Sequence, residues 1–401
     1  MDYAAGAPLD TRVFSAMKPY FLNEHGNPSA IYKEGVEAKH VIEEARAKIA
    51  SAIFAHQDEI IFTSGGTESN NLAIFGVTRA AHESGIIKPH IVTSVIEHPS
   101  VLNACRALEK TGEANVSYIG VDNDGIVNLA EFKKALRQET VLVSIMYANN
   151  EIGTIQPIRE IAKIIRQYRK SYLDVKRPSQ LGGSTPKLKY PYFHTDACQA
   201  MNYLDTHVER LGVDLLTFNG AKIYGPKGVG ALYKKRGVSL VPVLYGGGQE
   251  KGLRSGTENV PAIVGLAKAL EIARKIVEKE SVRQTKLRDC FISEIKKYFP
   301  DAVVNGSQTQ RLPNNINISF QNIESQHMVI MLDAKGIAVS AKSACSSGDE
   351  NASYVVSALD GQKWRADNSV RFSLGRNTTK KDIQKTIGAL QEIIKKYRLL
   401  K

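Results

Sequence analysis

A lysine at the expected end of a β-strand is the side chain in this sequence best placed for covalent chemistry. Lys222 lies in the run 219–228 (NGAKIYGPKG), directly after a β-prone apolar segment and within a glycine-rich stretch. An amine at the carboxyl end of a strand can form a Schiff base with an aldehyde cofactor. A lysine in a glycine-rich loop is more often a solvated surface group, so Lys222 alone leaves both interpretations open.

Three more segments place polar groups directly after expected strands. The run 62–69 (FTSGGTES) predicts a strand, a glycine turn and a helix start whose backbone N–H groups could bind a phosphate, although an ordinary capped turn fits it as well. His98 follows the next strand and could stack on a flat ring, but a lone histidine is more often structural. Asp196 follows another strand and could pair with a protonated pyridine nitrogen or, alternatively, cap a helix.

These segments belong to an alternating pattern of strands and helices. Strands are expected at 59–63, 90–95, 141–147, 192–195, 214–218 and 230–233, and helices at 33–54, 69–84, 99–111, 129–138 and 158–170. Such alternation predicts a mostly parallel sheet covered by helices. Open sheets of this class bind ligands at the carboxyl ends of their strands, where the polar segments lie. Their joint occurrence is therefore more specific than any one of them.

The pattern changes near residue 260. A helical region is expected over 261–298 with a break near Ser281, followed by strands at 315–320, 337–340 and 369–374 and helices at 325–334 and 380–397. This order predicts a large domain over 13–260 and a smaller α+β domain formed by 1–12 and 261–401. Residues 171–191, which contain several Pro, Gly, Ser and Lys residues, are expected to form an insertion loop.

Composition excludes several classes of protein. The 401 residues are 43% apolar and 23% charged, which is typical of a folded globular chain, and no apolar run approaches the ~20 residues of a membrane helix. The first residues show no secretory signal. The four cysteines form no CxxC pair, which argues against a disulfide framework and a cysteine-rich zinc site. We therefore expect a cytoplasmic protein with reduced thiols, no metal site and no membrane partner.

The net charge of +12 is unevenly distributed. Residues 169–192 and 380–401 each carry a net charge of +5, and the rest of the chain is nearly balanced. Such clusters are either solvated surface or docking surfaces for an acidic partner. The sequence has no basic repeat interleaved with aromatic residues, so direct binding of nucleic acid is not expected.

Together these segments resemble the pyridoxal-phosphate-dependent cysteine desulfurases of the class V aminotransferase superfamily, in their long-loop group. The resemblance runs from Asp2 to about Leu390. It includes 26–29 (GNPS), 149–153 (NNEIG), 246–250 (GGGQE), 254–259 (RSGTEN), 343–348 (SACSSG) and 371–376 (RFSLGR). It implies the type I pyridoxal-phosphate enzyme fold, in which a large domain with a mostly parallel seven-stranded sheet is joined to a smaller α+β C-terminal domain.

The resemblance also implies roles for the matching residues. Lys222 would hold the cofactor covalently, Asp196 would pair with its ring nitrogen, and His98 would stack on its ring. The remaining cofactor contacts would come from Gly66, Thr67, Asn150, Gln199 and Asn219, and from Thr257, which would reach the phosphate of the partner subunit in a homodimer. The substrate carboxylate would be held by Arg371 with Asn27 nearby, and Asn150 would also face the substrate.

The implied reaction converts L-cysteine to L-alanine and a persulfide on Cys345. Lys222 would move the α-proton, and Cys345 would attack the substrate sulfur as a thiolate. The persulfide would then pass to a sulfur-acceptor protein, either an iron–sulfur cluster scaffold or an enzyme of tRNA thiolation. Of the other cysteines, Cys105 and Cys290 are expected to be packing residues, and Cys198 lies beside the expected ring site.

Departures from the family pattern keep alternatives open. Ala221 stands where the family has a histidine that donates to the phosphate, so cofactor retention is expected to be weaker. Asn219 stands where the family has a serine, whose hydrogen bond its amide could replace. Lys342 stands where a small residue is common and could lower the pKa of the Cys345 thiol. The alternatives are a selenocysteine lyase, an aminotransferase of the same fold, and a catalytically weakened binding subunit of a sulfur-transfer complex.

Overall fold

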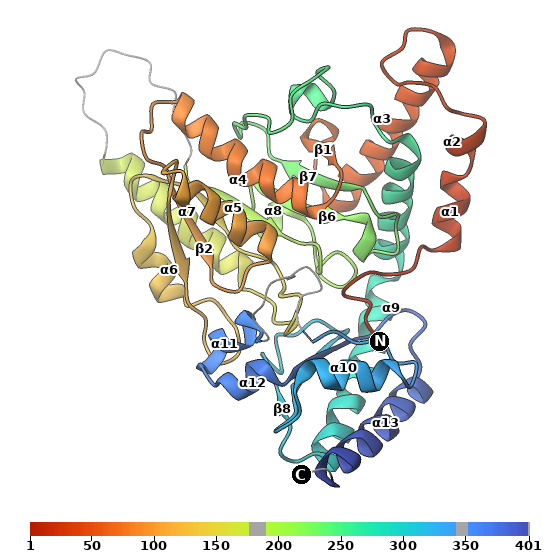
Figure 1. Ribbon diagram of the computed structural model, residues 1–401. Helices are drawn as coiled ribbons and strands as arrows, with labels where there is room; N and C mark the ends of the chain where they lie inside the picture. The colour runs from red at the N-terminus through yellow and green to blue at the C-terminus, as the bar shows by residue number, and fades with distance from the viewer. Residues whose placement is uncertain (176–189, 342–351, 400–401) are drawn as a thin grey trace.

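The larger part of the chain is built on a seven-stranded sheet (Figure 1). The computed structural model describes residues 1–175, 190–341 and 352–399. The strands are β1 (Ile60–Thr63), β2 (His90–Ser94), β3 (Asn115–Ile119), β4 (Thr140–Ser144), β5 (Tyr192–Asp196), β6 (Leu215–Asn219) and β7 (Gly230–Lys234), in the spatial order β1-β7-β6-β5-β4-β2-β3. Only β7 is antiparallel to its neighbours, which confirms the mostly parallel sheet.

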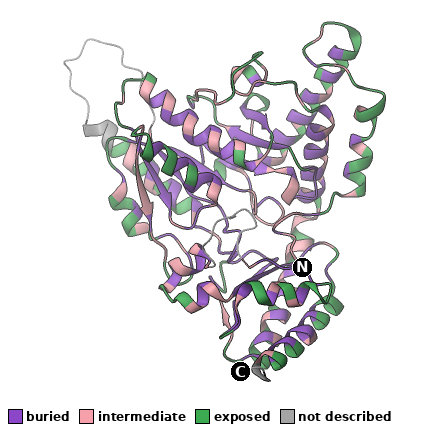
Figure 2. Ribbon diagram, viewed as in Figure 1, coloured by how far each residue is buried: buried purple, intermediate pink, exposed green. Residues whose placement is uncertain are grey.

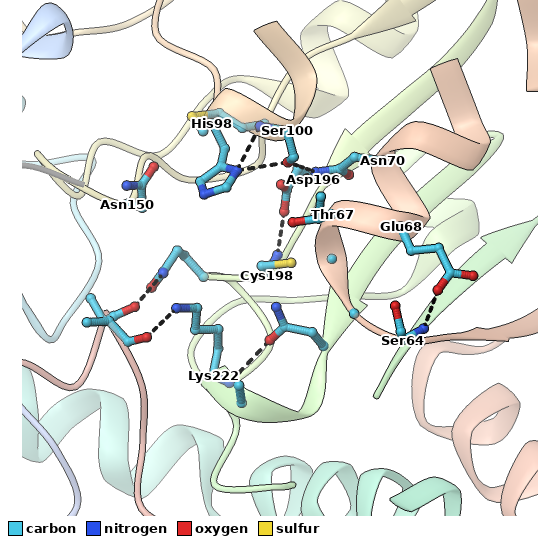
Figure 3. Close-up of a pocket in the computed structure, with 18 of the residues that line it drawn as sticks. Ser64, Thr67, Glu68, Asn70, His98, Ser100, Asn150, Asp196, Cys198 and Lys222 are labelled. Atoms are coloured by element: carbon cyan, nitrogen blue, oxygen red, sulfur yellow. Dashed lines mark hydrogen bonds between the residues drawn. The ribbon is translucent and has the colours of Figure 1, made fainter. Parts of the chain in front are cut away.

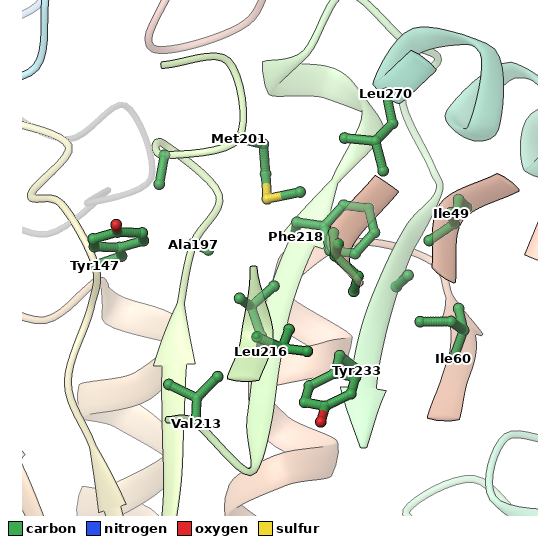
Figure 4. Packing of buried hydrophobic residues seen from close by; sticks show 14 of the residues in the cluster. Ile49, Ile60, Tyr147, Ala197, Met201, Val213, Leu216, Phe218, Tyr233 and Leu270 are labelled. Atoms are coloured by element: carbon green, nitrogen blue, oxygen red, sulfur yellow. The ribbon is translucent and has the colours of Figure 1, made fainter. Parts of the chain in front are cut away.

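Helices cover both faces of this sheet. They are α1 (Thr11–Met17), α2 (Pro19–Leu22), α3 (Lys33–Ile53), α4 (Gly66–Glu83), α5 (Pro99–Lys110), α6 (Leu129–Ala135), α7 (Ile158–Val175) and α8 (Val208–Leu211), with 3-10 turns η1 (Gln57–Glu59), η2 (Gly220–Lys222) and η3 (Glu250–Gly252). Alternate strand residues enter two cores: Leu216 and Phe218 pack toward α3 and α9, as Figure 4 shows, whereas Leu215 packs toward α4 and α5. The buried sheet and the exposed outer helix faces are visible in Figure 2.

One long helix, α9 (Val260–Tyr298), connects the two parts of the structure (Figure 1). The expected break near Ser281 is wrong, because α9 is continuous through this position. The segment 274–298 contains neither Pro nor Gly and is rich in Lys, Glu and Arg, which favour helix. The domain boundary expected near residue 260 coincides with the first residue of α9. The division of the chain into a large domain over 13–260 and a small domain formed by 1–12 and 261–401 stays a prediction.

The smaller part contains an antiparallel sheet in the order β10-β9-β8. Its elements are β8 (Val303–Val304), β9 (Asn315–Ser319), β10 (Ser369–Ser373), α10 (Ser325–Asp333), α11 (Tyr354–Asp360), α12 (Lys363–Asp367) and α13 (Lys380–Leu399). The strand expected over 337–340 is wrong, since Ser340 alone forms an isolated bridge, with Arg371. Ile337 instead donates its N–H to Leu332 and closes the end of α10. Asp2, at the start of the chain, forms a bridge with Ser373 on β10.

Candidate active site

A cavity of about 290 Å³ lies at the carboxyl ends of β1, β2, β4, β5 and β6 (Figure 3). These five strands run in one direction, because β7 is antiparallel to both β1 and β6. Most of the residues that the sequence singled out line this one cavity. They are Gly66, Thr67, His98, Asn150, Asp196, Gln199, Asn219 and Lys222, together with Ala221.

The first turn of α4 forms one wall of the cavity. Its N-cap is Gly65, which offers no side-chain cap to the first backbone N–H groups. A Cβ on Gly66 would come within 2.8 Å of Cys198 Sγ and 3.2 Å of Asn219 Nδ2, so the turn fits against its neighbours only with glycine there. A Cβ on Gly65, in contrast, would meet open space. An uncapped helix start that opens onto a cavity favours a bound anion such as a phosphate.

Lys222 enters the cavity from the turn after β6. Asn219, the last residue of that strand, caps the turn by accepting a hydrogen bond from the Lys222 backbone N–H at 3.2 Å. The Lys222 Nζ donates to the carbonyl oxygen of Ala5 at 2.6 Å, and Gln199 donates to the carbonyl of Ala4 at 3.1 Å. The N-terminal segment thus forms part of the cavity wall and holds the Lys222 amine in place.

Asp196 lies at the end of β5 with both carboxylate oxygens occupied by donors. Oδ2 accepts from Asn70 Nδ2 at 2.7 Å, and Oδ1 accepts from the backbone N–H of Cys198 at 2.9 Å. The second bond closes a turn of the chain, and the helix cap that the sequence also allowed is wrong, because the next helix after β5 is α8 (Val208–Leu211). Asn70 Nδ2 bonds Ser100 Oγ at 2.8 Å as well, and Ser100 Oγ lies 2.8 Å from Nδ1 of His98.

Burial shifts the acid–base behaviour of the groups around the cavity. It lowers the pKa of His98, an effect that the Asp196 carboxylate opposes and Lys222 reinforces. It raises the pKa of the Cys198 thiol well above its usual value, which favours the protonated thiol over the thiolate. Burial also raises the pKa of Glu97, next to His98, to about 8. Hydrogen bonds from Ser94 and Met146 to that carboxyl act in the opposite direction.

Arg371 lies on β10, beside the loop that carries Asn150. Its guanidinium donates to the Asn150 carbonyl oxygen at 2.9 Å and to Ser340 Oγ at 3.1 Å, and it forms an ion pair with Asp2 at 2.9 Å. Its Nε and the Asn150 Oδ1 are buried and have no hydrogen-bond partner among the described residues. Because a buried polar atom without a partner is costly, the Asn150 Oδ1, which belongs to a cavity-lining residue, is suited to meet a ligand; Arg371 itself is not among the residues that line the cavity.

The structure does not bring every expected residue to the cavity. Asn27 is exposed, accepts a hydrogen bond from the Ser29 N–H at 3.0 Å, and is not among the partners of Arg371. Thr257 is also exposed and does not line the cavity of its own chain. Cys345 and Lys342 lie outside the described residues, as does most of the expected insertion 171–191.

The sequence analysis missed Asn70, Ser100 and Asp2. Asn70 follows Gly66 by four positions, so it lies on the same face of α4 as the turn that opens onto the cavity, a spacing that could have identified it. Ser100 follows His98-Pro99 at the second position of α5, where helix starts commonly exchange side-chain and backbone hydrogen bonds. Asp2 gives no such signal, because its partner Arg371 is 369 residues away in the chain.

The residues present fit a flat aldehyde that carries a phosphate. The start of α4 offers N–H groups to the phosphate, Lys222 offers an amine, Asp196 offers a carboxylate and Asn150 offers an unpartnered oxygen. Within 1–175, 190–341 and 352–399, no group of three or more His, Cys, Asp or Glu side chains could hold a metal ion. None of the helices in these ranges is long and apolar enough to span a bilayer.

Known proteins resemble this chain over its whole length. A family model described as Aminotransferase class-V matches residues 1–175 and 179–386. The chain is 47% identical to the cysteine desulfurase IscS of Dictyoglomus turgidum over 400 residues, covering 100% of this chain and 95% of that protein. Its structure is similar to that of a NifS-like protein, with a TM-score of 0.87, 33% identity and 98% of both chains covered. It is also similar to SspA in complex with cysteine, with a TM-score of 0.76, 34% identity, and 93% of this chain and 97% of that one covered.

Proposed function

Because this chain belongs to the class-V aminotransferase family and, within it, to the cysteine desulfurases, we propose that it converts L-cysteine to L-alanine and a persulfide on Cys345. The observation that carries the proposal is the convergence of Lys222, Asp196 and the uncapped start of α4 on one cavity. An amine, a carboxylate and an anion site at the carboxyl ends of β6, β5 and β1 are the groups that this chemistry requires.

The cofactor of this family is pyridoxal phosphate, and the cavity has a suitable partner for each of its polar groups. The phosphate would be bound by Gly66 and Thr67 at the start of α4, together with Asn219. Lys222 would bind the aldehyde carbon covalently, and Asp196 would pair with the ring nitrogen. When bound, pyridoxal phosphate withdraws electrons from the substrate and so makes its Cβ–S bond labile. Asn150 would bond the ring hydroxyl, and Gln199 would lie beside the ring.

The residues of the chain would share the remaining tasks. Lys222 moves the α-proton of the substrate, and Asp196 keeps a proton on the ring nitrogen through charge. Arg371 binds the substrate carboxylate, with its buried Nε as the group that lacks a partner. The Cys345 thiolate then forms a bond to the substrate sulfur, and the Cβ–S bond breaks with its electron pair left on the alanine carbon, which takes up a proton.

The experiment that tests this proposal follows both products of L-cysteine. Protein supplied with pyridoxal phosphate and without added reductant is expected to form alanine and protein-bound persulfide in equal amounts during the first turnover. A reductant such as dithiothreitol is then expected to release the sulfur and allow repeated turnover. Transamination without release of sulfur would favour an aminotransferase, and turnover of selenocysteine alone would favour a lyase for that substrate.

We propose that the active form is a homodimer. Large exposed apolar side chains occur in α2, in the segment before α3 and in the loop before η3: Leu22 is 68% exposed, Ile31 is 96% exposed and Tyr245 is 74% exposed. A surface that such side chains form together is typical of an interface with another protein. Thr257 points to the same arrangement, since it lies outside the cavity of its own chain and would reach the phosphate site of the partner.

The recipient of the sulfur would be an acceptor protein that takes it from the Cys345 persulfide for iron–sulfur cluster assembly or tRNA thiolation. The basic segment 380–401 supports docking of an acidic protein surface through charge. The cytoplasmic location expected from the sequence stays a prediction.

Replacing Ala221 by histidine is expected to strengthen cofactor binding. Ala221 lines the cavity next to Lys222 but cannot donate a hydrogen bond, whereas Asn219 accepts the Lys222 N–H through Oδ1 and keeps only its Nδ2 group as a donor. One added hydrogen bond to a charged phosphate contributes about 1–3 kcal/mol, or a roughly 5- to 150-fold lower Kd for pyridoxal phosphate. Fluorescence titration of the apoprotein measures this Kd, and an unchanged value for Ala221→His would show that the substitution is neutral.

A further inference from the structure

A continuous hydrogen-bonded chain forms the wall of the cavity behind the His98 ring (Figure 3). It runs from Asp196 through Asn70 and Ser100 to His98, with donor–acceptor distances of 2.7, 2.8 and 2.8 Å. Asn70 is fully buried, and Asp196 and Ser100 are 8% and 9% exposed. No part of the family resemblance assigns a role to Asn70 or Ser100.

The direction of each bond in this chain follows from its chemistry. Asn70 must turn its amide nitrogen, and not its oxygen, toward the Asp196 carboxylate, because a carboxylate only accepts. The second N–H of the same amide then points at Ser100 Oγ, which accepts it. The Ser100 hydroxyl proton is therefore left to be donated to His98 Nδ1.

A second donor reaches the same ring nitrogen. The backbone N–H of Ser100 donates to His98 Nδ1 at 3.1 Å, which makes His98 the side-chain cap of α5. An N–H group has no lone pair to offer, so His98 Nδ1 must be the unprotonated nitrogen of the ring. In the neutral imidazole the proton is then on Nε2, on the side of the ring that does not contact Ser100.

We propose that Asn70 and Ser100 are positioning residues that fix His98 as its Nε2–H tautomer, so that His98 presents a hydrogen-bond donor to the cavity and does not act there as a base. Because Nε2 already carries a proton, abstraction of the α-proton is left to Lys222, whose amine approaches the cavity from the opposite side (Figure 3). His98 contributes by stacking and by donating to an acceptor, such as the sulfur of a substrate thiolate. This inference rests on the proposed function for its catalytic meaning.

The surroundings of His98 are consistent with a neutral ring. The charged groups that face it are Asp196 and Lys222, whose effects on the His98 pKa have opposite signs, and burial lowers that pKa further. The carboxyl of the neighbouring Glu97 is held by other groups, because its Oε1 accepts from Ser94 Oγ at 2.6 Å and from the Met146 N–H at 2.9 Å.

The tautomer can be observed directly in protein labelled with ¹⁵N only at histidine. The chain has nine histidines, and the signals of His98 are those missing from the spectrum of His98→Asn. In the holoenzyme near neutral pH, the long-range ¹H–¹⁵N correlations of His98 are expected to show an unprotonated Nδ1 and a protonated Nε2. A proton on Nδ1, or a doubly protonated ring at that pH, would overturn the proposal.

Substitutions at Ser100 test the positioning role. Ser100→Ala removes one of the two donors to the unprotonated nitrogen, so the pKa of His98 is expected to rise by about half a unit to one unit. Ser100→Thr restores a hydroxyl and is expected to return the pKa to the wild-type value. If Ser100→Ala leaves the His98 pKa unchanged, or if threonine fails to restore it, Ser100 does not act on the ring.

A matched control exists elsewhere in the sheet. Ser117 Oγ bonds Nε2 of His90 at 2.9 Å, outside the cavity, so Ser117→Ala removes a serine–histidine bond of the same kind. Ser117→Ala is expected to leave the His98 pKa unchanged. A shift of the His98 pKa in Ser117→Ala would show that loss of packing alone explains the effect of Ser100→Ala. These spectra need no turnover. The tautomer of His98 can therefore be determined even if the protein binds the cofactor but does not act as a desulfurase.

Discussion

Lys222→Ala is expected to abolish alanine formation from L-cysteine and to remove the yellow colour of the purified protein. The Lys222 amine is the group that would hold pyridoxal phosphate and then move the α-proton of the substrate. Loss of a general base alone slows a reaction by ~10²- to 10⁴-fold, and the loss of covalent cofactor attachment adds to this. The measurements are the absorbance spectrum and the rate of alanine formation with added pyridoxal phosphate.

Lys227→Ala is the matched control for this substitution. Lys227 lies in the same glycine-rich loop, but its side chain is exposed and does not line the cavity. We expect its colour and rate to equal those of the wild type. A Lys222→Ala protein that stays yellow and turns over at the wild-type rate would remove Lys222 from the mechanism, and a Lys227→Ala protein that loses its colour would assign the cofactor to Lys227 instead.

Asp196→Asn is expected to slow alanine formation by roughly 10²- to 10³-fold while the protein remains folded. The substitution keeps the size of the side chain but removes the charge that would hold a proton on the ring nitrogen. The amide oxygen can still accept from the Cys198 N–H, and the amide NH₂ can donate to Asn70 once the Asn70 side chain turns its oxygen, which is otherwise buried without a partner, toward it. The loss should therefore appear in kcat and in the cofactor spectrum, with little change in the melting temperature.

Asp205→Asn provides the comparison for Asp196. Asp205 pairs with Arg159 at 2.8 Å, away from the cavity, and its loss removes a surface ion pair of small energetic value. We expect its rate and spectrum to match those of the wild type. Equal rates for Asp196→Asn and the wild type would contradict the assignment of Asp196 to the ring nitrogen.

The central sheet is predictable because its strands are short apolar runs separated by helical stretches. β1, β2, β4, β5, β6 and β7 all lie within about four residues of their expected ends. β3 (Asn115–Ile119) was not expected, because it is an edge strand with half-exposed residues and lacks a continuous apolar run. The strand expected at 337–340 is an error of the opposite kind, because a strand was predicted where none forms. Ile337 and Val339 alternate and are buried as in a strand, but most of this segment pairs with no other strand.

The cavity residues are predictable where the chain marks them with a strand end followed by Gly, His, Asp or Lys. The residues that support them are harder to find from the sequence, because their partners are distant in the chain. Asn70 meets Asp196 across 126 positions, and Asp2 meets Arg371 across 369. Nothing local in a sequence encodes such pairs, which only the packing of α4 against β5 and of the N-terminus against β10 brings together.

The placement of Asn27 and Thr257 shows a different limit. Both were expected at the site from the family pattern, and both are exposed outside the cavity of their own chain. A single chain cannot complete a site to which a second subunit contributes. The role of Thr257 stays a prediction that depends on the homodimer, and the role of Asn27 beside Arg371 also stays a prediction.

The central claim is that this chain forms alanine by passing the sulfur of L-cysteine to Cys345. Its most direct test is the rate of alanine formation, with pyridoxal phosphate and a reductant, in the wild type and in Cys345→Ala. We predict turnover in the wild type, and a loss of alanine formation in a variant that keeps the yellow colour of the bound cofactor. Equal rates in the two proteins would contradict the account and assign the chain to a lyase that does not use Cys345.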